Sequence, residues 1–254
     1  MTSLTGKTAV VTGSSSGIGR AIALELAAAG TDVVVHAGRN RAGADETAAA
    51  IESLGRQAHV LVCDLTDAAQ HAQFVEQCFG WNRRVDIWIN NAGADVLTGE
   101  ASERSFEEKL ALLWQVDVQA TIALSRLAGQ RLMQAGGGCL VNIGWDQAES
   151  GMAGDSGEMF AAVKGAVMAF TRSLAKSLAP HVRVNCVAPG WIRTSWGEQA
   201  SDYWRERAVG ESLLARWGAP EDVARAVRFL VGPQSTFITG QTINVNGGFR
   251  GHAP

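Results

Sequence analysis

The stretch Thr12-Gly13-Ser14-Ser15-Ser16-Gly17-Ile18-Gly19 follows an apolar run near the start of the chain and leads into an amphipathic segment. Its glycines permit positive φ angles and a close approach of the backbone to a ligand. The N-terminus of the following helix offers unpaired N–H groups and a partial positive charge, which suit the pyrophosphate of a dinucleotide. Such a turn alone also fits a tight strand-to-helix connection, so the rest of the chain must decide.

Short apolar runs alternate with amphipathic segments along the remaining chain. The apolar runs predict strands at residues 8–12, 32–36, 58–63, 85–90, 139–143, 182–187 and 242–245. The amphipathic segments predict helices at residues 18–29, 44–54, 68–79, 106–133, 159–178 and 221–230. Near-continuous apolar strands indicate burial on both faces, and the alternation predicts a doubly wound parallel sheet of the Rossmann type. No linker or internal repeat interrupts the pattern, so we expect one α/β domain over residues 1–254.

Composition argues against several classes of function. The 254 residues carry a formal charge of −3 with no block of like charge, so we expect neither nucleic acid nor a membrane surface as a partner. The four cysteines lie far apart, which favours free thiols in a reducing, cytoplasmic compartment. The five histidines show no ligand spacing, and we assign no metal site. No apolar run approaches the roughly 20 residues of a membrane span.

Further polar segments follow the predicted strands in a recognisable order. Asp64-Leu65 follows the third strand, Asn90-Asn91-Ala92-Gly93 ends the fourth, and Pro189-Gly190-Trp191-Ile192-Arg193-Thr194 follows the sixth. Together with the Thr-Gly-x-x-x-Gly-x-Gly turn, they make residues 7–248 resemble the short-chain dehydrogenase/reductase family. The resemblance implies an NAD(P)-binding Rossmann domain, a substrate lid around residues 191–215, a small-molecule substrate and a homo-oligomer, either a dimer or a tetramer.

The resemblance also implies most of the contacts to the cofactor. In the turn, Gly13, Gly17, Ile18 and Gly19 would hold the phosphates. Asp64 would accept a hydrogen bond from the adenine amine, and the backbone N–H of Leu65 would contact the ring. The remaining implied contacts are to the riboses, from Asn91, Ala92, Gly93 and Lys164, and to the nicotinamide, from Pro189, Gly190, Ile192 and Thr194.

The end of the second predicted strand bears on the choice between NAD(H) and NADP(H). An acid there would accept the ribose 2′-hydroxyl, whereas an arginine would pair with a 2′-phosphate. This chain has His36-Ala37-Gly38-Arg39-Asn40-Arg41 without an acid, and Ser14 and Ser15 add hydroxyl donors. We therefore expect NADP(H) to be favoured over NAD(H), with Arg39 and Asn40 beside the phosphate. The alternative is that the two arginines are solvated loop charges.

Four positions carry the proton chemistry in this family: an asparagine, a serine, a tyrosine and a lysine. Lys164 matches the lysine, but the tyrosine position four residues earlier, on the same helix face, holds Phe160. The asparagine position holds Asp117, and the serine position holds Trp145, or Asp146 in a second alignment. A phenyl ring cannot exchange a proton, so the usual acid, worth about 10²–10⁴-fold, is missing from the motif. Lys164 fits cofactor binding and catalysis equally well.

A substitute acid is one way to explain these changes. Asp146 or Glu149 could face the substrate beside Trp145, Trp191 and Trp196, and a carboxylate among aromatic walls suits a flat, cationic or amine-bearing group. The polar residues nearby have a structural explanation: Asp155 or Ser156 would cap the next helix, and Glu158 would interact favourably with its dipole. Tyr203, in the lid, is better explained as a substrate contact or a surface residue.

Two functions of different class remain open. The first is an NADP(H)-dependent oxidoreductase with an altered acid, whose substrate could be an imine, because hydride addition to an iminium carbon creates no alkoxide to protonate. The second is a catalytically inactive NADP(H)-binding sensor or a partner in a hetero-oligomer. Elimination of halide, known in relatives of the family, fits poorly, because those relatives keep the tyrosine and lose the glycine-rich turn.

Overall fold

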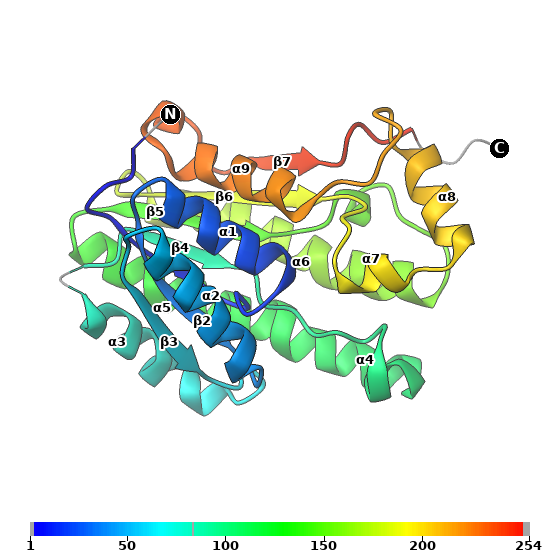
Figure 1. Cartoon of the computed structure of the whole chain (residues 1–254), viewed down its shortest axis with the longest axis horizontal. Helices are drawn as coiled ribbons and strands as arrows, with labels where there is room; N and C mark the ends of the chain where they lie inside the picture. The colour runs from blue at the N-terminus through cyan, green and yellow to red at the C-terminus, as the bar shows by residue number, and fades with distance from the viewer. Residues whose placement is uncertain (1–2, 83, 251–254) are drawn as a thin grey trace.

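The computed structural model describes residues 3–82 and 84–250, which form one α/β domain. Its centre is a parallel seven-stranded sheet in the order β3-β2-β1-β4-β5-β6-β7 (Figure 1). The predicted doubly wound Rossmann sheet is therefore confirmed. The strands are β1 (Thr8–Val11), β2 (Asp32–Ala37), β3 (Ala58–Val62), β4 (Ile87–Asn90), β5 (Gly138–Ile143), β6 (Val182–Pro189) and β7 (Thr242–Val245).

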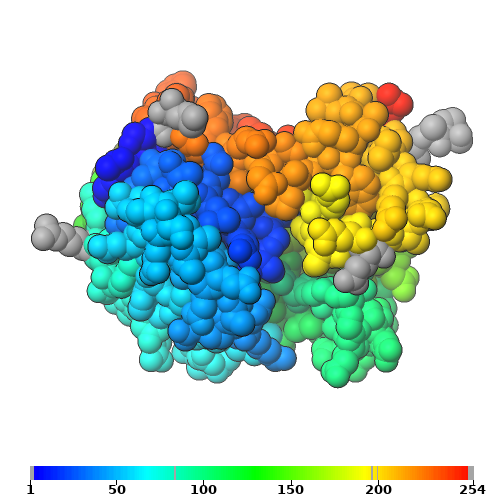
Figure 2. All heavy atoms as spheres, viewed as in Figure 1, coloured from blue at the N-terminus to red at the C-terminus, as the bar shows by residue number. Residues whose placement is uncertain are grey.

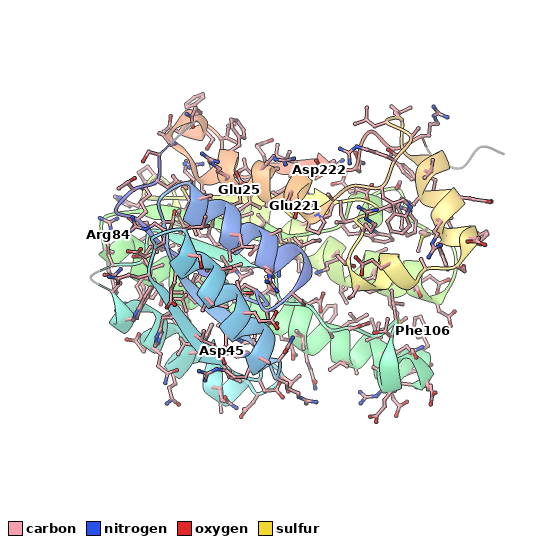
Figure 3. The ribbon with its side chains drawn as sticks, in the orientation of Figure 1. Glu25, Asp45, Arg84, Phe106, Glu221 and Asp222 are labelled. Carbon is pink, nitrogen blue, oxygen red and sulfur yellow. The ribbon has the colours of Figure 1, made fainter. Side chains whose placement is uncertain are left out.

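Helices cover both faces of the sheet. One face carries α1 (Gly17–Ala28), α2 (Arg41–Ser53) and α9 (Pro220–Val231), and the other carries α3 (His71–Trp81), α5 (Thr121–Gln134) and α6 (Asp155–Leu178). A buried apolar cluster lies under each layer, as expected for strands that are apolar on both sides. Glu25 on α1 lies beside α9 (Figure 3), where its carboxylate accepts a hydrogen bond of 2.8 Å from Arg228.

The predicted helix over residues 106–133 is divided by a π-helical segment. It consists of α4 (Phe106–Leu113), the π segment η3 (Trp114–Ala120) and α5. A π turn inserts an extra residue into the helical hydrogen-bonding pattern, and such insertions are frequent at functional sites. Here the segment contains Asp117, which is only 2% exposed. The sequence pattern gave no sign of this interruption.

Short helices and loops surround the carboxyl ends of the strands. The region around residues 191–215 contains α7 (Ser195–Gln199) and α8 (Asp202–Glu211), which lie beyond the ends of β6 and β7 in Figure 1. The remaining short helices are η1 (Ala68–Gln70), η2 (Gly99–Glu103), η4 (Asp146–Ala148) and η5 (Pro233–Ser235). Figure 2 shows the surface hollowed between the blue N-terminal helices and the yellow segment of α7. Among the described residues, no helix is both long and apolar enough to cross a membrane.

Candidate active site

A cavity of about 1180 Å³ lies at the carboxyl ends of the strands. In a doubly wound sheet this is where ligands bind. Its wall includes nearly all residues proposed above as cofactor contacts: Gly13, Ser15, Gly17, Ile18, Gly19, Arg39, Asn40, Asp64, Leu65, Asn91, Ala92, Gly93, Lys164, Pro189, Gly190, Ile192 and Thr194. The structure therefore brings these segments, which are far apart in the sequence, to one site.

The turn after β1 is packed so closely that it requires glycine. A Cβ atom on Gly19 would lie 2.1 Å from the carbonyl oxygen of Gly13, and one on Gly13 would lie 2.8 Å from Cα of Ala92. Asn91 holds the turn from the other side, donating through Nδ2 to the carbonyl oxygens of Thr12 and Gly13 at 3.0 and 3.1 Å. The helix α1 starts without a side-chain cap at Ser16. Its unpaired N–H groups and the close backbone approach fit the pyrophosphate of a dinucleotide.

His36 supports this turn, a role that the sequence analysis missed. Its Nδ1 accepts a hydrogen bond of 3.0 Å from the backbone N–H of Gly13, and its Nε2 donates to the carbonyl oxygen of Cys63 at 2.9 Å. Burial lowers the pKa of His36 to about 4, so the ring is neutral and can accept at Nδ1. The sequence did contain a signal for this role, because His36 is a polar residue near the end of the apolar run of β2.

Ser14 is the one expected cofactor contact that the cavity wall lacks. Its hydroxyl donates to the carbonyl oxygen of Val11 at 2.8 Å and accepts from the backbone N–H of His36 at 3.0 Å. The side chain is fully buried, so the expected hydroxyl donor to the cofactor faces inward. The expectation that the hydroxyl of Ser14 donates to the cofactor is therefore wrong. Ser15, the other expected hydroxyl donor, does line the cavity.

Arg39 and Asn40 lie in the loop that follows β2 and line the cavity there. The guanidinium of Arg39 is 89% exposed and donates to Asp64 Oδ2 at 3.3 Å. Hydrogen bonds from the hydroxyl and backbone N–H of Thr66, with a smaller contribution from Arg39, lower the pKa of Asp64. Asn40 caps α2 by accepting a hydrogen bond of 3.0 Å from the N–H of Gly43. Arg41 turns away and pairs with Asp45 at 2.8 Å.

Lys164 and Asp117 form an ion pair in the cavity wall. Lys164 Nζ lies 2.7 Å from Asp117 Oδ1, and the two side chains are 13% and 2% exposed. The second carboxylate oxygen of Asp117 accepts a hydrogen bond of 2.9 Å from the backbone N–H of Ala94. A Cβ atom on Gly93 would lie 2.9 Å from Asp117 Oδ1, so glycine at this position allows the approach. Both charges are thus paired within the protein.

Phe160 and Trp145 lie side by side in the same wall. Their ring centroids are 6.2 Å apart in an edge-to-face arrangement, which is favourable for two aromatic rings. Phe160 comes one helical turn before Lys164 on α6, and both side chains line the cavity. The position beside Lys164 is therefore occupied by a ring without a hydroxyl group.

Asp146 does not reach the cavity. Its Oδ2 accepts a hydrogen bond of 2.9 Å from Nδ2 of Asn246, and neither residue lines the cavity. Glu149 is exposed and pairs with Arg172 at 3.7 Å. Neither carboxylate lines the cavity, and their partners Asn246 and Arg172 do not line it either. The expectation that Asp146 or Glu149 faces the substrate is therefore wrong. Of the two alignments for the serine position, the structure places Trp145 in the wall.

The buried carboxyl group of Asp146 is expected to make stability depend on pH. Burial raises the pKa of Asp146 to about 6, and its buried Oδ1 has no hydrogen-bond partner among the residues that the structure describes. A raised pKa means that the folded state binds the proton more tightly, so this contribution to stability is complete below pH 4 and is lost as pH rises through 6. Asp146→Asn should therefore raise the free energy of unfolding at pH 8 by about 2–3 kcal/mol, with no gain at pH 4.

Urea denaturation at pH 4 and pH 8 measures this difference. Glu149→Gln is the matched control, because that side chain is 69% exposed and its removal should change little at either pH. An equal gain for Asp146→Asn at both pH values would contradict a titrating carboxyl group.

The region around residues 191–215 adds two tryptophans to the wall. Trp191, from the loop after β6, and Trp204, from α8, both line the cavity, with ring centroids 5.6 Å apart. Tyr203 is 63% exposed and accepts a hydrogen bond of 3.4 Å from Arg207, so it does not face the cavity. The side chain of Trp196 lies outside the described residues. Groups of three or more metal-binding side chains are absent from the part of the chain that the structure describes.

Comparisons with known proteins agree with this architecture. The protein family described as Enoyl-(Acyl carrier protein) reductase matches residues 13–250. The chain is 36% identical, over 253 residues and 98% of both proteins, to the 3-oxoacyl-[acyl-carrier-protein] reductase of Synechocystis. It is also similar to a short-chain dehydrogenase from Burkholderia cenocepacia in complex with NADP, with 33% identity, a TM-score of 0.86 and coverage of 96% and 98%.

A second solved structure shows the same likeness with a different cofactor. It is a 7α-hydroxysteroid dehydrogenase complexed with NADH and 7-oxo glycochenodeoxycholic acid, with 28% identity and a TM-score of 0.88. The match covers 97% of this chain and 95% of that chain. By matched sequence, fold and arrangement of the cavity, this chain belongs to the short-chain dehydrogenase/reductase family.

Proposed function

We propose that this protein is an NADP(H)-dependent oxidoreductase that reduces a cationic C=N bond, such as that of a cyclic iminium, in preference to a neutral ketone. The observation that carries the proposal is the ion pair between Lys164 Nζ and Asp117 Oδ1, 2.7 Å apart in the cavity wall. In this proposal the cofactor is held by the turn after β1 and by the loops that follow β3, β4 and β6. When bound and reduced, the nicotinamide supplies the hydride.

The ion pair determines the net charge that a substrate meets. With a neutral asparagine in place of Asp117, the ammonium of Lys164 would leave this wall positively charged. The buried carboxylate cancels that charge, so a cationic substrate meets no uncompensated like charge. Because these groups are only 13% and 2% exposed, water screens the ammonium little, and the cancellation matters more than it would on the surface.

The aromatic side chains support the same choice of substrate. Reduction of a ketone creates an alkoxide that needs a proton, and Phe160 cannot donate one. An iminium carbon already carries positive charge, and its reduction gives a neutral amine without proton transfer. Phe160 and Trp145 instead present aromatic groups, whose faces attract cations. In this proposal they orient the substrate and exclude water.

The choice of NADP(H) rests on the surroundings of Arg39. Arg39 lines the cavity, and its guanidinium has one hydrogen bond to the described residues, to Asp64, so donors remain for a 2′-phosphate. Binding of NADP by the Burkholderia relative supports this choice, whereas the hydroxysteroid dehydrogenase with NADH shows that the fold also accepts the other cofactor.

Arg39→Ala is expected to weaken NADPH binding about 10–100-fold, because a charge-assisted hydrogen bond contributes about 1.5–3 kcal/mol. NADH lacks the 2′-phosphate, so its affinity should change little. Calorimetric titration with both cofactors measures the difference. Arg41→Ala is the control, because Arg41 pairs with Asp45. Equal losses for NADPH and NADH would contradict a contact with the phosphate.

Turnover by the purified protein tests the reaction. With NADPH, we expect loss of the cofactor's absorbance on addition of N-methyl-3,4-dihydroisoquinolinium and none with cyclohexanone. Tight binding of NADPH without oxidation across iminium, imine and carbonyl panels would contradict the proposal. That result would favour the second candidate, a non-catalytic cofactor sensor or hetero-oligomer partner, for which Phe160 beside Lys164 is the supporting observation.

We also propose that the protein forms a homo-oligomer, a dimer or tetramer. Phe229 on α9 is 47% exposed, and Phe237, after η5, is fully exposed. Large apolar side chains that are exposed on adjoining parts of the surface favour a protein interface, and α9 contacts η5, the element just before Phe237. Light scattering coupled to size-exclusion chromatography measures the mass, and a monomer at micromolar concentration would contradict the proposal.

A further inference from the structure

Glu211 stands out as a buried carboxylate in an electrostatically unfavourable place. It is the last residue of α8 and only 5% exposed. The carbonyl groups at a helix C-terminus carry partial negative charge, so an acid there is disfavoured. The cost is offset by two short hydrogen bonds, from Nε of Arg207 to Oε1 and from Nε1 of Trp191 to Oε2, both 2.7 Å long.

These bonds connect Glu211 to the aromatic wall of the cavity. Its carboxylate holds Trp191 directly. It also holds the guanidinium of Arg207, which lies 5.8 Å from the ring centroid of Trp191 and 5.2 Å from that of Trp204. Cation–π contacts of this kind orient both rings. Trp191 and Trp204 are the two members of the group that line the cavity.

Backbone hydrogen bonds also hold the C-terminal end of α8 in place. The N–H of Arg250 donates to the carbonyl oxygen of Glu211 at 2.8 Å, and the N–H of Leu213 donates to that of Gly248 at 2.8 Å. The carboxylate thus belongs to a segment that is held against residues 248–250.

We propose that Glu211 is a positioning residue that holds Trp191 and Trp204 in place as an aromatic wall, and that this wall selects a substrate with a planar ring. The wall recognises shape more than charge, because Glu211 neutralises Arg207. Charge selection belongs to Asp117. The inference rests on the proposed function only in placing the substrate in this cavity.

Two cations of equal charge and different shape test the inference by binding alone. N-methylquinolinium is planar, and N,N-dimethylpiperidinium is not. Titrated calorimetrically into protein saturated with NADP⁺, which has no hydride to transfer, the planar cation should bind the natural chain at least about tenfold more tightly. Equal affinity for the two cations would overturn the inference.

Variants then locate the source of the preference. Glu211→Ala should abolish it, whereas Glu211→Gln should retain it, because the amide oxygen still accepts the hydrogen bond from Trp191. Glu206→Gln, an exposed acid on the same helix, is the matched control and should retain it. Since Glu211 is buried, Trp204→Leu provides a second variant that removes half of the wall and leaves the carboxylate in place; it should also lose the preference.

A folded Glu211→Ala protein that still prefers the planar cation would overturn the positioning role. Loss of the preference in a folded Glu211→Gln protein would also overturn it, because the charge of Glu211 rather than its bond to Trp191 would then be responsible. Failure of the proposed reaction is distinguishable. Planar preference without iminium turnover contradicts the reaction alone, and turnover without planar preference contradicts the wall alone.

Discussion

Phe160→Tyr is expected to confer reduction of neutral ketones by NADPH, a reaction for which the natural chain should show no measurable turnover. The added hydroxyl would lie on α6 beside Trp145 and one turn before Lys164. There it can donate the proton that an alkoxide requires. General acid catalysis contributes about 10²–10⁴-fold. We expect the lower end of this range, because Asp117 pairs with the Lys164 ammonium and so weakens its effect on the phenol.

Steady-state kinetics with cyclohexanone and an iminium substrate measure this change. Phe160→Leu is the matched control, because it alters the shape of the wall without adding a proton donor. The iminium reaction needs no acid, so Phe160→Tyr should leave its rate nearly unchanged. A folded Phe160→Tyr protein that binds NADPH and gains no ketone turnover would contradict the assigned position of the substrate. Ketone turnover by the natural chain would show that another group already donates the proton.

Local patterns were sufficient to predict the fold, and the family resemblance implied most of the residues that line the cavity at the strand ends. Strands that are apolar on both faces and glycines at a strand-to-helix turn are determined by neighbouring residues. The strand ends were therefore predicted to within a few residues, for example Thr242–Val245 without error. Asn91 comes one residue after β4 and Arg39 two residues after β2, so their place at the cavity follows from the topology of a parallel sheet.

The direction of individual polar side chains could not be predicted in the same way. Asp146 is held outside the cavity by its hydrogen bond to Asn246. That partner lies 100 residues later in the chain, so the pattern around Asp146 does not reveal it. The ion pair of Asp117 with Lys164 depends on the π turn in η3 and on the packing of this segment against α6. His36 binds Gly13 across a strand pair. Each of these contacts joins distant segments, so no periodicity within one segment reveals it.

Asp117→Asn is expected to lower kcat/KM for an iminium substrate by about 100-fold. The variant leaves the ammonium of Lys164 without its counter-charge in the cavity wall. For unit charges about 6 Å apart at an effective dielectric constant of about 20, the repulsion amounts to about 3 kcal/mol. The amide oxygen can still accept the hydrogen bond from the N–H of Ala94, so the local backbone should be retained.

Steady-state kinetics with the iminium and calorimetry with NADPH measure the effect. Glu100→Gln is the matched control, because it removes an exposed carboxylate from the same cavity wall and should change the iminium reaction little. Removing one partner of a buried ion pair costs about 3–5 kcal/mol of stability. The melting temperature with NADP⁺ bound must therefore show that the variant is folded under the assay conditions.

The double variant Phe160→Tyr/Asp117→Asn separates charge selection from general damage to the site. Because the uncompensated ammonium of Lys164 lowers the pKa of a neighbouring phenol and repels a cation, ketone reduction should rise above that of Phe160→Tyr while iminium reduction falls. Damage to the cavity would lower both rates. A loss of both reactions in a folded protein would contradict the role of Asp117. A rise in one rate with a fall in the other would assign the choice of substrate to the charge of this ion pair.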